Sequence, residues 1–372
     1  MNRSSPEILR ELRGRLGNMY NLDEILIQSV KVRASDIHLT TGRPPSYRID
    51  GVLAPIEGER LTPQMLEDIL MPLMDVRHRE ELQNNGQTDF AYAISGVGRF
   101  RVNVFKQRGT LASVMRSLPF NIPEPEDLGI PAEVVEMTTR KRGLILVTGP
   151  TGSGKSTTLA SLIHVINRNY PYHIITLEDP IEYLHRHDKS VVNQREIGSD
   201  STDYAQALRA ALREDPDVIL VGEMRDLETI STAITAAETG HLVFSTLHTI
   251  GADKIIDRII DVFPPNQQQQ IRIQLASVLE CVVSQQLLKK ADGSGRVAAL
   301  EVLFANNAVR NLIRESKTYQ IASIMQTNKR AGMQTMDDAL YDLYMRKLID
   351  ADNAVTYAQD PVSMNKKVNF DF

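Results

Sequence analysis

Apolar and polar residues recur along the chain with two different periods, and the first part mixes both. Over residues 21–32 the apolar positions follow the 3.6-residue period of an amphipathic helix, whereas residues 34–39 alternate as in a half-buried strand. Further patterns predict hairpins at 45–56, with an Asp50-Gly51 turn, and at 89–105, a helical stretch at 62–84 and a strand at 111–116. Residues 21–117 therefore predict a small α+β domain built on an antiparallel sheet.

Residues 118–131 interrupt this pattern with four prolines and intervening acidic residues. Proline fixes φ and has no N–H donor, so this stretch cannot continue a helix or a central strand. We interpret it as a stiff, proline-rich linker between two domains; a structured loop within one domain is the alternative. Residues 1–20 are polar and basic and form an N-terminal extension of unknown role.

From residue 132 onward, short apolar strands alternate with helical stretches. The predicted strands are 144–148, 173–177, 218–221 and 242–246. This alternation is typical of a parallel sheet covered by helices on both faces. Later helices are predicted at 266–290, which would include Cys281, and at 306–314, 318–327 and 335–348. We expect an α/β domain over residues 132–372 with helices at its C-terminal end.

Residues 149–156 match the phosphate-loop pattern G-x-x-x-x-G-K-[ST] between a predicted strand and a predicted helix. The glycines let backbone N–H groups surround a phosphate, and the helix start adds a positive dipole end. Lys155 can reach the β- and γ-phosphates, and the Ser156 hydroxyl can ligate Mg²⁺. We predict ATP and Mg²⁺ as cofactors. The expected nucleotide-binding residues are Gly149, Pro150, Thr151, Gly152, Ser153, Gly154, Lys155, Ser156 and Thr157.

Polar residues also follow the other predicted strands, and carboxyl ends of parallel strands share one sheet edge. Phosphoryl transfer requires neutralised charge and an oriented water. We expect Glu223 to act as general base or to hold a Mg²⁺-bound water, and Glu178 to share the metal or water role. His248 could sense the γ-phosphate. Glu182 and His241 are further candidates for nucleotide contact. For each of these side chains a purely structural role is the alternative.

Three arginines of the first domain are candidates for a role in trans. Arg99 and Arg101 lie two residues apart on a predicted strand and share a face, and Arg116 lies on the next strand. A planar guanidinium suits the spread charge of a phosphoryl group. These arginines could contact a phosphate bound by another subunit. The alternative is that they only form a solvated face of the strands.

Composition narrows the class of partner. The chain has 372 residues, 42% of them hydrophobic, and a formal net charge of −5. This charge provides no global basic field for nucleic acid. No apolar run approaches the roughly 18 residues of a membrane-spanning helix. The single cysteine allows neither a disulfide nor a cysteine zinc site, and the N-terminus lacks an apolar signal core. We expect a cytoplasmic protein.

The order of these segments resembles that of the secretion-type motor ATPases, and most closely the type IV pilus retraction ATPases, the PilT twitching-motility family. The resemblance covers about residues 21–350. It rests on residues 34–39, 99–101, the phosphate loop, an acidic box at 178–182, the segment 212–226 and a histidine box at 239–249. Residues 308–315, with Val309 where Ile is usual, and 332–337 look like the motifs of retraction motors.

The resemblance implies a PAS-like domain over 21–117, a RecA-like P-loop ATPase domain over 132–372 and a homohexameric ring. It implies nucleotide between the two domains, first-domain arginines reaching the phosphates, and Glu223 as the catalytic acid. It also implies an inner-membrane pilus platform protein as partner, through which the chain associates peripherally with the cytoplasmic face of the membrane at the pilus base. The implied activity is pilus retraction powered by ATP hydrolysis, with no nucleic acid and no small-molecule substrate other than ATP.

Several alternatives remain open. Extension and type II secretion motors usually carry a four-cysteine zinc loop, which one cysteine excludes; an accessory retraction motor is not excluded. A RecA-like nucleic-acid translocase would need a basic channel, and the net charge of −5 argues against this class. A GTPase needs an Asn-Lys-x-Asp base reader, and the nearest match, 328–331, lacks the aspartate. A nucleotide-binding scaffold without turnover is a further alternative, for which Glu223→Gln would change no rate.

Overall fold

The computed structural model describes residues 20–49, 51–118 and 121–370. The chain divides into two compact units between Asn121 and Ile122, within the segment predicted as a linker. Asp50 of the predicted hairpin turn, Pro119 of the predicted linker and the extension up to residue 19 lie outside the described residues. Within the described ranges, no helix is long and apolar enough to cross a membrane.

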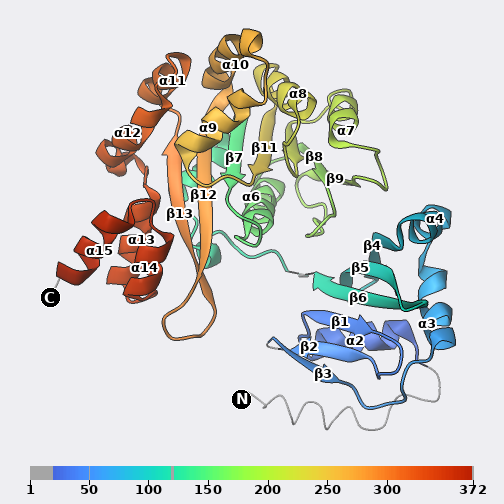
Figure 1. The fold of residues 1–372 in the computed structure, drawn as a ribbon. Coiled ribbons are helices and arrows are strands. Elements are labelled where there is room, and N and C mark those ends of the chain that lie inside the picture. Colours follow the sequence, from blue (N-terminus) through green and yellow to red (C-terminus); the bar gives the residue numbers. More distant parts are fainter. Residues whose placement is uncertain (1–19, 50, 119–120, 371–372) are drawn as a thin grey trace. The chain divides into compact units, whose positions relative to one another are not determined.

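The first unit is built on a six-stranded antiparallel sheet with the order β3-β2-β1-β6-β5-β4 (Figure 1). Alternate residues of β5 point into the core: Phe100 and Val102 are fully buried, and the arginines on either side of Phe100 take the other face. The predicted α+β domain is confirmed. Its elements are α2 (Leu22–Lys31), β1 (Asp36–Leu39), β2 (Ser46–Ile49), β3 (Val52–Pro55), α3 (Pro63–Leu70), α4 (Val76–Asn85), β4 (Gln87–Ile94), β5 (Gly98–Gln107) and β6 (Thr110–Leu118).

The helical stretch predicted at 62–84 is two helices rather than one. A 3₁₀ turn at Met71–Leu73 separates α3 from α4. Pro72 cannot donate within a continuing helix, and the Asp75 side chain accepts a hydrogen bond from His78 N, so Asp75 caps the start of α4.

The second unit contains a seven-stranded sheet with the order β13-β12-β7-β11-β10-β8-β9. All its neighbours pair in parallel except β12 and β13, which pair antiparallel. Every residue of β7, β10 and β11 is buried, because helices cover both faces. The strands are β7 (Gly143–Thr148), β8 (His173–Glu178), β9 (Val191–Glu196), β10 (Val218–Val221), β11 (Leu242–Leu247), β12 (Leu279–Lys289) and β13 (Arg296–Phe304).

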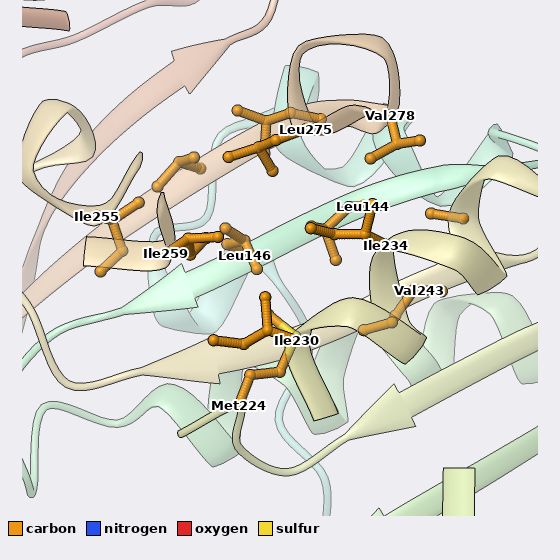
Figure 2. Packing of buried hydrophobic residues seen from close by; sticks show 14 of the residues in the cluster. Leu144, Leu146, Met224, Ile230, Ile234, Val243, Ile255, Ile259, Leu275 and Val278 are labelled. Atoms are coloured by element: carbon orange, nitrogen blue, oxygen red, sulfur yellow. The ribbon is translucent and has the colours of Figure 1, made fainter. Parts of the chain in front are cut away.

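Alternate residues of the central strands pack against different helices. Leu144 and Leu146 of β7 face α8, α9 and α10 (Figure 2). Ile145 and Val147 face α5 and α6 instead. The two apolar layers hold the strand ends in fixed positions. The helices are α5 (Ala132–Glu136), α6 (Lys155–Asn169), α7 (Tyr204–Ala211), α8 (Leu227–Glu238), α9 (Ala252–Asp261), α10 (Pro265–Val278), α11 (Asn307–Arg314), α12 (Ile321–Thr327), α13 (Met336–Met345), α14 (Ala351–Tyr357) and α15 (Pro361–Phe370).

The helix predicted over 266–290 is wrong in its second half. Helix α10 ends at Val278, and Leu279 begins β12, so Cys281 is a fully buried strand residue. Because β12 lies between β7 and β13 with both faces covered, its apolar residues do not alternate with polar ones and could not be distinguished from a buried helix. The edge strands β9 and β13 have no counterpart in the prediction either.

The C-terminal helices α13, α14 and α15 pack on the end of the β12–β13 hairpin, which reaches past the other strands (Figure 1). Leu288 and Ala299 of the hairpin share a buried cluster with Leu340 and Met364. Glu301 of β13 is only 3% exposed and accepts hydrogen bonds from Ala252 N, Met336 N and the Gln359 side chain. Burial raises the pKa of Glu301, against the lowering effect of these donors.

Candidate active site

The phosphate loop joins β7 to α6 as predicted from the sequence pattern. Gly149, Gly152 and Gly154 have φ values of 139°, 82° and 90°, which favour glycine. A Cβ atom at Gly149 would lie 2.2 Å from the carbonyl oxygen of Gln285, so no other residue fits there. Pro150 and Thr151 are exposed in the loop, whereas Ser153 is buried. The loop therefore has the tight, inward-turning backbone that a phosphate requires.

Lys155 begins α6 and directs its ammonium group back to the loop. Nζ donates to Gly149 O at 2.9 Å and to Pro150 O at 3.0 Å, and the residue is 9% exposed. Burial lowers the pKa of Lys155, while the negative charges of Glu182 and Glu223 act in the opposite direction. The helix dipole of α6 adds positive potential at the same place. The Lys155 ammonium is thus held by two carbonyl oxygens of the loop, which phosphate oxygens could replace.

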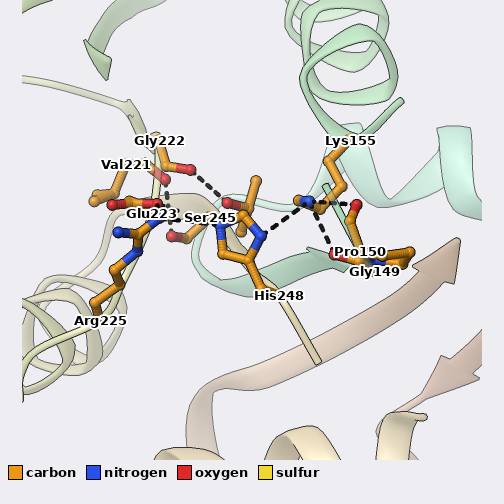
Figure 3. Close-up of polar contacts among 10 residues, drawn as sticks. Gly149, Pro150, Lys155, Val221, Gly222, Glu223, Arg225, Ser245 and His248 are labelled. Carbon is orange, nitrogen blue, oxygen red and sulfur yellow. Dashed lines mark hydrogen bonds and ion pairs between the residues drawn. The ribbon is translucent and has the colours of Figure 1, made fainter. Parts of the chain in front are cut away.

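Glu223 and His248 meet Lys155 at the carboxyl edge of the sheet (Figure 3). Glu223 Oε2 lies 2.8 Å from Arg225 Nη2 and 3.4 Å from His248 Nε2. His248 Nδ1 lies 3.5 Å from Lys155 Nζ. His248 Nε2 also lies 3.4 Å from Arg225 Nη2, so each ring nitrogen faces a cationic side chain. The structure brings these three predicted residues together; Arg225 is an addition, although it stands only two positions after Glu223 in the same segment.

The turn that carries Glu223 is fixed by neighbouring strands. The hydroxyls of Ser245 and Thr246 on β11 donate to Val221 O and Gly222 O (Figure 3). A Cβ atom at Gly222 would lie 2.8 Å from Tyr204 Oη and 3.0 Å from Leu177 O. The absence of a side chain at Gly222 therefore allows the ends of β8 and β10 to approach closely.

Glu178 ends β8 in a different electrostatic environment. Its Oε1 accepts from Thr176 Oγ1 at 2.7 Å and from Gln194 Nε2 at 3.1 Å. Desolvation raises the pKa of Glu178 to about 7, although these two hydrogen bonds favour the charged form. Gln194 lies on the unpredicted strand β9, so the sequence pattern missed it. A carboxyl group that is partly protonated near neutral pH suits water or proton handling better than direct metal ligation.

The remaining predicted ligands lie around the first turn of α6. Ser156 is partly exposed there, and Thr157 Oγ1 lies 2.9 Å from Tyr183 Oη, on the segment after the acidic box. Glu182 is also partly exposed and acts on Lys155 through its charge. In the part of the chain that the structure describes, no group of three or more His, Cys, Asp or Glu residues could hold a metal ion. A metal at this site would depend on Ser156 and on phosphate oxygens.

His241 lies at the opposite end of β11 from His248. Its Nδ1 lies 3.0 Å from Ala236 O, and its carbonyl oxygen accepts from Gly143 N at the start of β7. The structure therefore does not bring His241 together with the phosphate loop of the same chain.

The three arginines share one face of the first unit. Arg99 and Arg101 lie on β5, and Arg101 is directly opposite Arg116 of β6. Arg116 Nε donates to Asp36 Oδ1 at 2.9 Å, whereas Arg101 Nε lies 3.7 Å from Asp89 Oδ1. Burial acts to raise the pKa of Asp36, but hydrogen bonds from Ser35 and Arg116 outweigh it and lower the pKa. Arg116 therefore has a structural partner within its own unit.

The sheet order places one strand, β11, between the strand of the phosphate loop and the strand that precedes Glu223. Two strand spacings are about 10 Å, and His248 at the end of β11 lies in this interval between Lys155 and Glu223. A phosphate loop, a buried lysine and an acid in this arrangement define a P-loop ATPase of the RecA-like class.

Comparisons with known proteins narrow this class. The family model described as "Type II/IV secretion system protein" matches residues 18–356. The "Type IV pilus retractation ATPase PilT" of Pseudomonas aeruginosa is 47% identical over 341 residues, which are 92% of this chain and 99% of that protein. A "Twitching motility protein" of Neisseria gonorrhoeae is 47% identical over 90% of this chain and 91% of its own length.

A solved structure agrees. The crystal structure of the pilus retraction motor PilT with bound ADP matches with a TM-score of 0.87 and 54% identity, over 92% of this chain and 98% of that one. The chain belongs to the type II/IV secretion system protein family and, within it, to the type IV pilus retraction ATPases.

Proposed function

We propose that this chain hydrolyses ATP at the carboxyl edge of β7, β11 and β10 and uses the energy to power retraction of a type IV pilus. The series of contacts from Lys155 through His248 to Glu223 is the observation that carries the enzymatic part. The retraction part is supported by the names and the nearly full-length coverage of the relatives.

Binding begins at the phosphate loop. The inward N–H groups receive the phosphates, and the Lys155 ammonium exchanges the carbonyls of Gly149 and Pro150 for phosphate oxygens, which make stronger, charge-assisted hydrogen bonds. Ser156 and the phosphate oxygens would hold Mg²⁺, which supplies neutralisation of the phosphate charge. Thr157, at the next position of α6, is proposed to contact the same phosphates.

Hydrolysis requires an oriented water. Glu223 is held in place by its contacts with Arg225 and His248, and its carboxylate orients the water and accepts its proton. His248 lies between Glu223 and Lys155 and is positioned to respond to the terminal phosphate. Glu178, with its raised pKa, assists by holding the water or relaying the proton rather than by ligating the metal.

The assembled state completes this proposal. Six chains form a ring, and arginines Arg99, Arg101 and Arg116 of the first unit reach the phosphates of a nucleotide in the ring. Movement of the units in response to ATP supplies the stroke. An inner-membrane platform protein at the pilus base is the partner, which places the ring at the cytoplasmic face of that membrane.

Separate measurements of binding and turnover test the enzymatic proposal. We expect Glu223→Gln to bind ATP normally but to lose at least about a hundredfold in single-turnover rate, because the amide cannot accept the proton of the water. Lys155→Ala should lose nucleotide binding itself. Equilibrium titration with ATP and single-turnover kinetics distinguish the two effects.

The matched control is Glu238→Gln, which neutralises an exposed acid at the far end of α8 whose side chain contacts Gln274. This variant should turn over ATP like the unmodified protein. Normal turnover in Glu223→Gln would contradict the role assigned to that carboxylate.

A further inference from the structure

Gln285 is a buried polar residue of β12 directly beside the phosphate loop. It is 4% exposed. Strand β12 pairs in parallel with β7, with Ser284 opposite Thr148, so Gln285 follows at the level of Gly149. A buried amide requires hydrogen-bond partners, and those of Gln285 all belong to the loop and its helix.

The amide of Gln285 makes two well-defined hydrogen bonds. Nε2 donates to Ser153 O at 2.7 Å, and Oε1 accepts from Thr158 Oγ1 at 2.8 Å. Nε2 would also lie only 2.9 Å from a Cβ atom at Gly154. The backbone carbonyl oxygen of Gln285 lies against Gly149. This one residue therefore contacts both ends of the loop and the first turn of α6.

The bond to Ser153 fixes the direction of the next N–H group. The carbonyl of Ser153 and the N–H of Gly154 belong to one trans peptide and point in opposite directions. Because Gln285 holds the carbonyl toward β12, the Gly154 N–H points away from β12. Glycine rotates freely about φ, so this peptide can reverse unless something outside the loop holds it.

We propose that Gln285 is a positioning residue that keeps the Gly154 N–H directed at a bound phosphate, which rests on the nucleotide binding proposed above. Its side chain acts through the Ser153–Gly154 peptide. The bond to Thr158 anchors the amide to α6 and leaves Nε2 aimed at Ser153.

The test compares nucleotide affinity among variants of the full chain. Gln285→Leu removes the donor at nearly constant size, and its affinity for ADP should fall at least about tenfold, the effect of one lost hydrogen bond to a charged group. Its affinity for AMP, which has one phosphate fewer in the loop, should fall less. Thr158→Val removes only the anchoring hydroxyl and should lower ADP affinity by less than Gln285→Leu does, because the Nε2 donor remains.

The matched control is Gln286→Leu, the same change at the next position of β12. The Gln286 side chain donates to Tyr357 O at 3.2 Å, away from the loop, so this variant should bind ADP like the unmodified protein. Thermal unfolding without nucleotide confirms that each variant is folded.

The ADP affinity of Gln285→Glu should depend on pH, which a merely structural role of Gln285 would not produce. A protonated glutamic acid can donate to Ser153 O, whereas a carboxylate can only repel it. The ADP affinity of this variant should therefore fall as pH rises from about 6 to about 9, with no such fall in Gln286→Glu.

Two results overturn the inference. The first is that Gln285→Leu folds and binds ADP with the affinity of the unmodified protein. The second, which applies if Gln285→Leu does not fold, is that Gln285→Glu binds ADP with the affinity of the unmodified protein at every pH. Either result would leave the proposed function standing, whereas failure of the unmodified protein to bind ADP would overturn that function instead.

Discussion

Glu178 and Glu223 are carboxyl groups at the same sheet edge with opposite electrostatic surroundings. Glu223 has the Arg225 guanidinium 2.8 Å away. Glu178 is desolvated and receives hydrogen bonds from neutral donors, the Thr176 and Gln194 side chains and the Glu182 N–H, and desolvation raises its pKa to about 7. Two acids whose environments differ in this way can take different roles in one reaction.

The raised pKa of Glu178 predicts a specific pH dependence of stability. The folded state binds this proton more tightly than the unfolded chain, whose glutamate pKa is 4.5, so the contribution is present below that pH and is lost as pH rises through about 7. A shift of this size corresponds to on the order of 3 kcal/mol. Glu178→Gln should remove that part of the decline, measured by urea unfolding between about pH 5 and about pH 8.

The control is Glu238→Gln, the exposed acid at the far end of α8. It should keep the pH dependence of the unmodified protein. Parallel stability curves for Glu178→Gln and the unmodified protein would refute the assignment.

Strands β5 and β6 place Arg101 and Arg116 opposite each other, but the two arginines differ in their ion pairs. Arg116 pairs at 2.9 Å with Asp36, which is 6% exposed, whereas Arg101 is 3.7 Å from the exposed Asp89. We expect Arg116→Ala to cost about 1 to 2 kcal/mol of unfolding free energy and Arg101→Ala less than about 0.5 kcal/mol. If the arginines serve a phosphate in the ring, both variants lose ATP hydrolysis, and Arg101→Ala does so without loss of stability.

Denaturant unfolding and steady-state hydrolysis measure the two effects. Arg77→Ala, which removes an exposed ion pair with Glu81 on α4, is the control and should change neither. Hydrolysis at the unmodified rate in Arg101→Ala would remove that residue from the site.

The elements that the sequence predicts well are those with a clear period or a clear boundary. Strand β5 alternates between buried Phe100 and the flanking arginines, and β7 is followed by the phosphate loop, so both could be placed. Strand β12 is buried at nearly every position and continues directly from α10. Its strand conformation depends on pairing with β7 and β13, which are distant in sequence, and no local pattern reports that pairing.

The candidate site divides in the same way. Lys155, Glu223 and His248 follow strands that the apolar runs reveal, so their convergence could be predicted. Gln285 and Gln194 could not, because each acts from a strand that was not recognised. His241 stands near His248 in sequence but at the other end of β11 in space.

For the whole molecule, the two units have separate cores. The first unit surrounds Phe100 and Met115, and the second contains the layers on either face of the seven-stranded sheet. The phosphate loop, Glu223 and His248 all belong to the second unit, and the three arginines belong to the first. A ring that combines these groups would make activity depend on assembly.

Dilution tests that dependence. If six chains form the proposed ring and the arginines act between chains, Mg²⁺-dependent ATP hydrolysis per chain should fall as the ring dissociates. Hydrolysis and particle mass should be measured on the same dilution series. Activity that persists in a monomer would mean that one chain completes its own site, and the arginine and ring proposals would both be replaced.

Glu301 links two segments that are far apart in sequence. Its carboxyl group receives the first N–H of α9, which follows the histidine box, and the first N–H of α13, which opens the C-terminal helices. If nucleotide binding moves the backbone after His248, Glu301 would couple that movement to α13. A spectroscopic label on the C-terminal helices would then report occupancy of the nucleotide site from a distance.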